Sequence, residues 1–339
     1  ASRALLLYRR RDCRWRGQRT AATGVGTSMY ATCWSVLPKF DVLSHARWLC
    51  VSLRPATLSS RLPLVSLSSC RAVALQLSPH ASGAPSLHGT RAALGLSQQL
   101  ASVADSLRVV VFTFGALSIR PFDATSDAAN GSVWGFARVA RLEHSAACMS
   151  SVDVSAGVHI RGLHALMGCS SEVETAWSGQ ACCVPRLRAC TASTSQGASV
   201  ARGRYVITGG LGGLGVRAAV LLAAGGAAHV LLASRTGHVA RGSPGLVAQL
   251  ESASAAACDV GDAADALSLL TQASLTGVLH AAGVLDDKML RFMSVSDLNA
   301  VFAPKARAAS HIDIANTRTP LEAMGLFSSV ASTFGNVGQ

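Results

Sequence analysis

The chain has 339 residues, half of them apolar and 14% charged, so it can bury large cores and is not an intrinsically disordered protein. Its net charge of +12 is concentrated at the start, where residues 1–100 carry thirteen Lys and Arg against two acids. A nucleic-acid surface needs its basic residues on the folded, motif-bearing part, so we expect no nucleic-acid partner. The ten cysteines include no CxxC pair and no His pair lies at metal-ligand spacing, so we expect no metal site.

Residues 1–27 show no periodicity and are left unassigned, as a linker or a leader. The chain begins with Ala1 rather than Met, so we expect it to be part of a longer protein. This Arg- and Ser-rich start is compatible with a transit segment, although a divergent linker explains it better. We therefore expect a cytoplasmic protein without a membrane span, or a plastid protein if the start is a targeting segment.

The next part of the chain contains both strand and helix patterns. In chain order, we predict strands at Met29–Leu37, Arg108–Phe114 and Val152–Val154, and helices from Arg91 and over Gly131–Leu142. Residues 193–204 are small and polar, as in a linker. We therefore predict one domain over residues 28–200 and a second over residues 201–339.

Strands and helices alternate from Tyr205 onward. We predict strands at 205–210, 229–234, 257–260, 277–282 and 324–328, with helices ending at Ala224 and lying within 242–256, 262–270 and 297–314. This order predicts an α/β fold with a Rossmann-like, doubly wound parallel sheet in residues 201–339.

The first strand of this domain leads into a Gly-rich turn, Gly210-Leu211-Gly212-Gly213-Leu214-Gly215, which fits G-x-G-x-x-G. Glycines let the backbone approach a pyrophosphate, whose charge is met by the helix N-terminus. Arg235 lies twenty residues beyond Gly215, at the end of the next strand. An arginine there suits the 2′-phosphate of NADP, whereas an acid would bind the ribose of NAD. We therefore predict an NADPH site.

Two further strand ends are candidates for cofactor contacts. Asp259 follows Cys258 at the third strand, where it either reaches an adenine edge or caps the next helix. His280 begins His280-Ala281-Ala282-Gly283, whose small residues suit the nicotinamide half, although a lone histidine is more often structural. The full set of expected cofactor-binding residues is Thr208, Gly209, Gly210, Leu211, Gly212, Gly213, Leu214, Gly215, Ser234, Arg235, Asp259, Val260, His280, Ala281, Ala282 and Gly283.

Six ordered motifs in residues 203–339 resemble the ketoreductase domain of type I polyketide synthases, in the short-chain dehydrogenase/reductase superfamily. They are YVITGGLGGLG, LLASR, CDV, LHAAGVLDD, FAPKARAA and FSSVASTFGNVGQ. Upstream, MYATCWSVLP, VVVFTFGA and SVWGFARVARLEH are similar, more weakly, to that family's non-catalytic structural subdomain. The resemblance implies that this smaller, truncated Rossmann subdomain precedes the catalytic one and has no cofactor site.

The resemblance also implies a reaction: NADPH reduces the β-ketone of an acyl chain tethered to an acyl carrier protein, within a multidomain polyketide synthase. Ser329 matches the family's catalytic serine and Lys305 its lysine. The family's tyrosine and asparagine would fall beyond Gln339, so we expect this chain by itself to reduce no ketone. Leu211 and Ser332 also depart from the family pattern, where threonine and glycine are usual.

Leu285-Asp286-Asp287 matches the LDD signature of B-type members of this family, and the tryptophan of A-type members would fall at Phe334. Both marks imply the D-configured 3-hydroxyacyl product, although the two acids could instead cap the next helix. Two other interpretations stay open: a fatty acid synthase ketoreductase, and a non-catalytic domain that keeps the fold for assembly.

Overall fold

The computed structural model describes residues 29–36, 48–53, 72–78, 84–100, 107–119, 128–145, 147–155, 172–179, 181–190, 201–238, 253–271 and 274–339. The unassigned start, the linker at 193–200 and most of the helix expected within 242–256 lie outside these residues. The chain forms two compact units. One, here called the seven-stranded unit, contains residues 30–190, 286–299 and 330–339; the other, the five-stranded unit, contains residues 1–29, 191–285 and 300–329.

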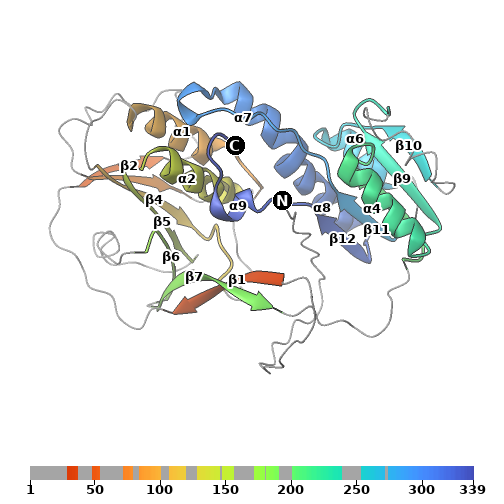
Figure 1. The fold of residues 1–339 in the computed structure, drawn as a ribbon, viewed down its shortest axis with the longest axis horizontal. Helices are drawn as coiled ribbons and strands as arrows, with labels where there is room; N and C mark the ends of the chain where they lie inside the picture. Colours follow the sequence, from red (N-terminus) through yellow and green to blue (C-terminus); the bar gives the residue numbers. More distant parts are fainter. Residues whose placement is uncertain are drawn as a thin grey trace. The chain divides into compact units, whose positions relative to one another are not determined.

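The seven-stranded unit is built on one sheet with the order β1-β7-β6-β5-β4-β3-β2 (Figure 1). Its strands are β1 (Met29–Val36), β2 (Trp48–Leu53), β3 (Ala72–Leu77), β4 (Arg108–Phe114), β5 (Cys148–Val154), β6 (Glu174–Ser178) and β7 (Ala181–Cys190). From β2 to β6, each strand pairs in parallel with the next in the sequence. β7 pairs with β6 in the antiparallel direction.

Two helices, α1 (His88–Leu100) and α2 (Gly131–Glu143), pack on the same face of this sheet. Alternate residues of a strand point to opposite faces. Accordingly, Val109 and Val111 of β4 join the core with both helices, whereas Val110 and Phe112 lie in a second apolar cluster with residues of β5, β6 and β7. A 3₁₀ turn, η2 (Ala128–Asn130), precedes α2.

Two later segments belong to the same unit. The first holds the 3₁₀ turn η3 (Leu290–Phe292) and the start of α7 (Val295–Phe302); the second holds α9 (Ala331–Phe334). Gln98 of α1 donates to the carbonyls of Leu290 (3.1 Å) and Met293 (2.8 Å). The carboxylate of Glu143, at the end of α2, accepts from the backbone N–H of Leu290 (2.8 Å) and of Gly338 (3.0 Å).

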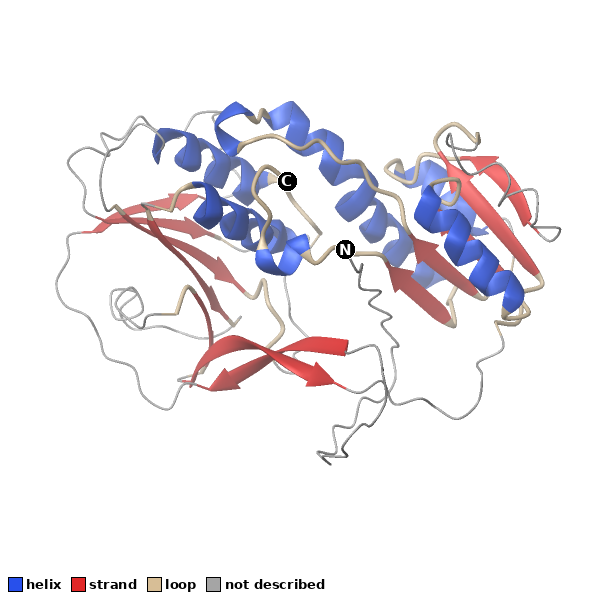
Figure 2. Ribbon diagram, in the orientation of Figure 1, coloured by secondary structure: helices blue, strands red, loops and turns tan. Residues whose placement is uncertain are grey.

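The five-stranded unit has an all-parallel sheet with the order β10-β9-β8-β11-β12. Its strands are β8 (Arg204–Thr208), β9 (His229–Ser234), β10 (Ala253–Ala257), β11 (Gly277–His280) and β12 (Ala323–Leu326). Its helices are α4 (Gly213–Ala224), α6 (Ala263–Thr271) and α8 (Ala308–Arg318), with a π-helical turn, η4 (Ala303–Arg307), before α8. Figure 2 shows these helices and strands by type.

Helices cover both faces of this sheet. Ile207 of β8 packs with Ala218 and Ala219 of α4, whereas its neighbour Val206 packs with residues of α6 and α8. A strand buried on both faces needs a continuous apolar run, and YVIT provides one. The predicted α/β fold with a doubly wound parallel sheet is confirmed.

Three details differ from the sequence prediction. The third strand is Ala253–Ala257 rather than 257–260, because a run of small residues carries little pattern and the strand is fixed by its pairing with β9. The helix expected over 297–314 is interrupted by the π-helical turn, which contains Pro304; proline removes a backbone donor and crowds the preceding turn. The seven-stranded unit also contains four strands that were not predicted, β2, β3, β6 and β7.

Candidate functional site

The Gly-rich turn lies where the sequence places it, between β8 and the first turn of α4. The local geometry explains three of its glycines. A side chain at Gly210 would put its Cβ 2.5 Å from the carbonyl oxygen of Ile207, and one at Gly215 would lie 2.5 Å from that of Gly209. A Cβ at Gly213, by contrast, would meet nothing within 4 Å. Gly210 and Gly215 therefore allow the turn to pack, while Gly213 leaves its backbone open to a ligand.

This open side of the turn faces a pocket of about 730 Å³ at the carboxyl ends of β8, β9, β10 and β11. The strand order reverses between β8 and β11, and such a reversal in a parallel sheet opens a crevice at the carboxyl ends. The pocket is lined by Gly209, Leu211, Gly212, Gly213, Leu214, Gly215, Arg217, Ala233, Ser234, Arg235, Thr236, His238, Cys258, Asp259, Val260, Ala281, Ala282, Gly283, Val284 and Pro304. Most of the expected cofactor-binding residues are thus brought together.

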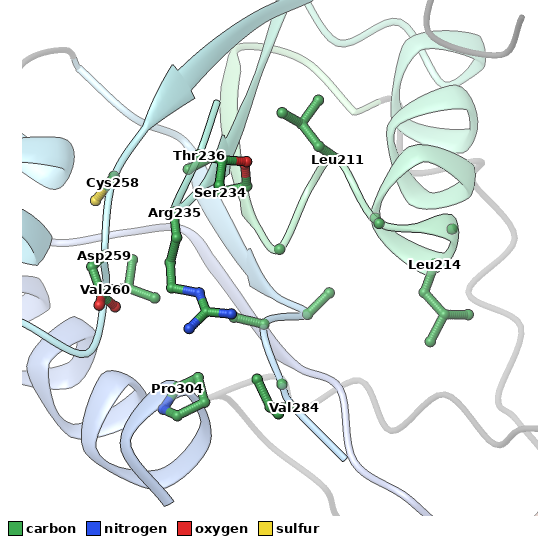
Figure 3. A pocket seen from close by; sticks show the side chains of 18 of the residues that line it. Leu211, Leu214, Ser234, Arg235, Thr236, Cys258, Asp259, Val260, Val284 and Pro304 are labelled. Carbon is green, nitrogen blue, oxygen red and sulfur yellow. The ribbon is translucent and has the colours of Figure 1, made fainter. Parts of the chain in front are cut away.

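Positive and polar side chains gather where β9 ends. The exposed Arg235 side chain extends into the pocket beside Ser234 and Thr236 (Figure 3). Arg217, from the first turns of α4, and His238 also line the pocket. The hydroxyl of Ser234 accepts from the N–H of Gly237 at 3.0 Å, which stabilises the turn that carries Arg235. This edge can therefore receive a dianionic group.

Asp259 lines the pocket but lies two residues beyond the end of β10. Its Oδ1 accepts from the N–H of Gly261 at 3.0 Å. Asp262 instead caps α6, because its Oδ1 accepts from the N–H groups of Ala264 (2.9 Å) and Asp265 (3.1 Å). The helix-capping alternative left open for Asp259 therefore belongs to Asp262, which the sequence interpretation did not single out.

His280 does not line the pocket. Its side chain is 2% exposed, and its ring contacts Thr208 Oγ1 through Nδ1 (2.6 Å) and the Lys305 carbonyl oxygen through Nε2 (3.0 Å). Burial, together with the nearby Lys305 charge, lowers the pKa of His280 to about 4 against the opposing effect of the hydrogen bond to the carbonyl. The imidazole is neutral at pH 7. Thr208 and Gly210 also lie outside the pocket lining.

The two expected catalytic residues are both in the five-stranded unit. Lys305 is half-buried in the π-helical turn, and this burial lowers the pKa of its ammonium. A Cβ at Gly283 would lie 3.4 Å from Lys305 Nζ, so the Lys305 side chain extends over the glycine after β11. Ser329 is exposed, three residues beyond the end of β12.

The three LDD residues differ in their surroundings. Leu285 and Asp287 are exposed. Asp286 accepts from Lys288 Nζ at 3.1 Å, and the same ammonium pairs with Asp297 at 2.8 Å. Asp297 and Ser294 exchange hydrogen bonds at the start of α7, as in a capping box, and the ammonium of Lys288 lowers the pKa of Asp297. The residue capping α7 is therefore Ser294, with Asp297 as its partner in the capping box, and neither Asp286 nor Asp287 caps this helix.

Sequence reasoning missed several pocket residues. Arg217 and His238 lie outside the strand-end positions that the motif specifies, and Pro304 comes from a distant helix. In the part of the chain that the structure describes, no group of three His, Cys, Asp or Glu side chains could hold a metal ion. Nor is any helix within those ranges both long and apolar enough to cross a membrane.

Two family models match the chain, one on each side of residue 200. The model described as "KR domain" matches residues 203–339, and "Polyketide synthase extender module SpnB, Rossmann fold domain" matches residues 20–187.

Curated relatives agree with these models. "Polyketide synthase GfsB" of Streptomyces halstedii is 32% identical over 274 residues, and "Pikromycin polyketide synthase component PikAIII" of Streptomyces venezuelae is 33% identical over 244 residues. These alignments cover 74% and 67% of this chain but only 5% and 15% of the relatives.

Solved structures are similar over most of the chain. "Structure of A-type Ketoreductases from Modular Polyketide Synthase" matches with a TM-score of 0.79 and 27% identity, covering 91% of this chain and 76% of that one. "The Structure of a C2-type Ketoreductase from a Modular Polyketide Synthase" matches with a TM-score of 0.75 and 26% identity, covering 91% and 77%.

Proposed function

We propose, from the premise that this chain belongs to the ketoreductase domain family of polyketide synthases, that its five-stranded unit binds NADPH. The observation that carries this is the pocket at the strand-order reversal, with an arginine at the end of its second strand. NADPH, when bound, supplies a hydride. We further propose that, in a synthase that carries this domain, the acceptor is the β-ketone of an acyl chain on an acyl carrier protein, whose carbon takes the hydride and whose oxygen takes a proton to give a 3-hydroxyacyl group.

Different residues of the pocket would bind the different chemical groups of NADPH. The open backbone at Gly213, in the first turn of α4, suits the pyrophosphate, since the N–H groups of a first helical turn have no partner within the helix. Arg235 suits the 2′-phosphate, and Arg217 and His238 line the same pocket. Small residues at 281–283 leave room for the nicotinamide half against the backbone.

Two side chains would act on the ketone oxygen. The Ser329 hydroxyl would donate a hydrogen bond to it, and the Lys305 ammonium would stabilise the negative charge that develops during reduction. Burial already lowers the pKa of Lys305, which makes its ammonium a stronger proton donor than that of an exposed lysine. Residues 28–200 would be the non-catalytic structural subdomain, and the partners would be the carrier protein and neighbouring synthase domains, in the cytoplasm.

We assign B-type stereochemistry, and so a D-configured product, from Leu285-Asp286-Asp287 and from Phe334 in place of tryptophan. The similarity to A-type and C2-type structures does not weigh against this, because product stereochemistry depends on individual side chains and not on the backbone fold. Chiral analysis of the 3-hydroxyacyl product of a synthase that carries this domain tests the assignment. An L-configured product would refute it.

Cofactor binding tests the main proposal in the chain itself. Titration with NADPH and NADH, followed by nicotinamide fluorescence, should give NADPH a preference of about tenfold to a hundredfold, the effect of charge-assisted bonds to one phosphate. Arg235→Gln should remove that preference and leave NADH affinity unchanged. Arg202→Gln makes the same charge change at an exposed position outside the pocket lining and should have no effect. Equal affinity for both nucleotides in the wild type would contradict the proposal.

A further inference from the structure

A buried chain of hydrogen bonds joins three elements of the five-stranded unit. Thr208 and His280 are paired residues at the ends of the adjacent strands β8 and β11. Thr208 Oγ1 lies 2.6 Å from His280 Nδ1, and His280 Nε2 lies 3.0 Å from the carbonyl oxygen of Lys305 in the π-helical turn. Both side chains are almost fully buried, 0% and 2% exposed. The imidazole therefore connects the sheet to the backbone of the turn that carries Lys305.

The partners of the ring determine its tautomer. A carbonyl oxygen can only accept, so Nε2 must carry the hydrogen that it donates to Lys305. In the neutral ring Nδ1 is then an acceptor, and the Thr208 hydroxyl donates to it. With a pKa of about 4, His280 holds no second proton at pH 7. It is thus a fixed hydrogen-bond donor and not an acid or base of the reaction.

The backbone around the Lys305 carbonyl is irregular because it lies in the π-helical turn. Pro304 disturbs the helix at this point, and the N–H of Ala308 donates to the carbonyls of both Ala303 and Lys305 instead of to a single regular partner. A widened turn of this kind is less constrained by its own hydrogen bonds than an α-helix. His280 supplies a constraint from the sheet.

The Lys305 side chain is placed against the same strand end. Its Nζ would be 3.4 Å, and its Cδ 3.6 Å, from a Cβ built on Gly283, three residues after His280. The carbonyl and the ammonium of Lys305 are thus both positioned by residues at, or just beyond, the carboxyl end of β11. A displacement of about 1 Å in a reacting group can reduce a rate a hundredfold. The position of the Lys305 ammonium therefore matters for the rate of the proposed reaction.

We propose that His280 is a positioning residue for Lys305, which as an Nε2–H donor fixes the π-helical turn so that the ammonium lies over Gly283. His280 contacts neither substrate nor cofactor in this role. The inference rests on the proposed function, in which Lys305 is the catalytic lysine.

The test uses two matched substitutions of the histidine. In His280→Gln, the side-chain amide nitrogen falls near the position of Nε2 and can still donate to the Lys305 carbonyl. In His280→Asn, the shorter amide falls near the position of Nδ1 and reaches Thr208 but not Lys305. The readout is the ¹³Cε resonance of Lys305 in the lysine-labelled chain, which contains only Lys39, Lys288 and Lys305. Lys305→Arg assigns the signal.

In His280→Asn we expect the Lys305 resonance to shift and its titration midpoint to rise toward that of an exposed lysine, about 10.4, while Lys288 stays unchanged. His280→Gln should keep both properties near those of the wild type. A Lys305 signal that is identical in all three proteins, or a Gln variant that behaves like the Asn variant, would overturn the proposal.

If His280→Asn does not fold, Thr208→Val keeps the imidazole and removes only the hydroxyl that donates to its Nδ1. It should move the Lys305 resonance in the same direction by a smaller amount, and no movement would overturn the proposal. NADPH titration of the wild type is a separate arm. Absence of binding there refutes the cofactor assignment, whereas normal binding with an unmoved Lys305 signal refutes only the role of His280.

Discussion

The two units use parallel strands in different orders, and this difference accounts for where the pocket lies. In the seven-stranded unit, β2 to β6 follow one another across the sheet in sequence order, with α1 and α2 on one face. In the five-stranded unit the chain begins in the middle at β8, extends to β10 on one side and continues with β11 and β12 on the other. Only such a reversal sends helices to opposite faces and opens a crevice between adjacent strand ends.

The acidic residues at the strand ends show the same contrast. Asp153, in β5, is fully buried and accepts hydrogen bonds from Thr113 Oγ1 (2.6 Å) and from the N–H groups of Ala116 (3.0 Å) and Leu117 (3.2 Å). Burial raises the pKa of Asp153 against these bonds. Asp259, beyond β10, is exposed and lines the pocket. One carboxylate stabilises a loop, and the other remains available to a ligand.

The largest expected effect comes from removing the buried carboxylate. Asp153→Ala leaves three donors without their acceptor and should lower the free energy of unfolding by about 4 kcal/mol. Four of the five tryptophans, Trp34, Trp48, Trp134 and Trp177, lie in the seven-stranded unit, so tryptophan fluorescence during urea unfolding follows mainly that unit. The matched change Asp259→Ala lies in the five-stranded unit, and urea unfolding followed by circular dichroism should show a loss of less than about 0.5 kcal/mol. Equal losses would remove the distinction between the two strand ends.

Acid should destabilise the five-stranded unit through His280. Its pKa is about 4 in the folded protein, against 6.5 for the free side chain, so below pH 6.5 the unfolded chain takes up a proton that the folded chain does not. Stability therefore falls as the pH drops from 6.5 to 4, by on the order of 3 kcal/mol in total.

Urea unfolding followed by circular dichroism at pH 7 and pH 4.5 measures this loss. His280→Gln should be less sensitive to acid than the wild type, with no change in the tryptophan transition of the seven-stranded unit. An unchanged acid sensitivity in the variant would show that His280 is not the group responsible.

Substitutions at two glycines of the turn should distinguish an effect on folding from an effect on cofactor binding. Gly210→Ala forces a Cβ to within 2.5 Å of the Ile207 carbonyl oxygen and should destabilise the five-stranded unit by about 2 kcal/mol. Gly213→Ala meets open space, so it should leave thermal stability within about 0.5 kcal/mol and weaken NADPH binding instead. Melting by circular dichroism and fluorescence titration distinguish the two. A stable Gly210→Ala chain would contradict the packing role.

The smallest effect concerns Glu143, which accepts from Leu290 and Gly338 in the seven-stranded unit. Glu143→Ala should speed hydrogen exchange of both amides about five- to tenfold, the equivalent of roughly 1 kcal/mol per bond. Glu143→Gln keeps one acceptor oxygen, so only one of the two amides should lose protection. Unchanged exchange at both amides in the alanine variant would exclude this role.

Elements with a distinctive local sequence pattern were predicted well. Elements whose position depends on long-range pairing were predicted poorly. The run Arg108–Phe114 and the run His229–Ser234 are strands with the predicted bounds, because buried apolar runs next to turns are distinctive. The Gly-rich turn could be identified because close backbone contacts require glycine at positions of its motif. The strand Ala253–Ala257 was misplaced, since its place depends on pairing with β9 rather than on its side chains.

Prediction of the pocket was also limited to residues that a local sequence motif specifies. The motif specifies residues next to the strand ends, so Arg235 and Ala281 could be predicted, whereas Arg217 and Pro304 reach the pocket only through the packing of helices. The connection between His280 and Lys305 was also missed, because it joins residues twenty-five positions apart across a π-helical turn. No sequence pattern marks such a turn apart from Pro304.

Hydrogen exchange of the whole chain with and without NADPH tests the central comparison most directly. Bound nucleotide should protect backbone amides in 209–217, 234–238, 258–260 and 281–284, which follow four strand ends of the five-stranded unit. The corresponding segments of the seven-stranded unit, 115–117 and 153–155, should exchange as they do without the nucleotide. Protection at those segments, or no protection at the four strand ends, would contradict the account.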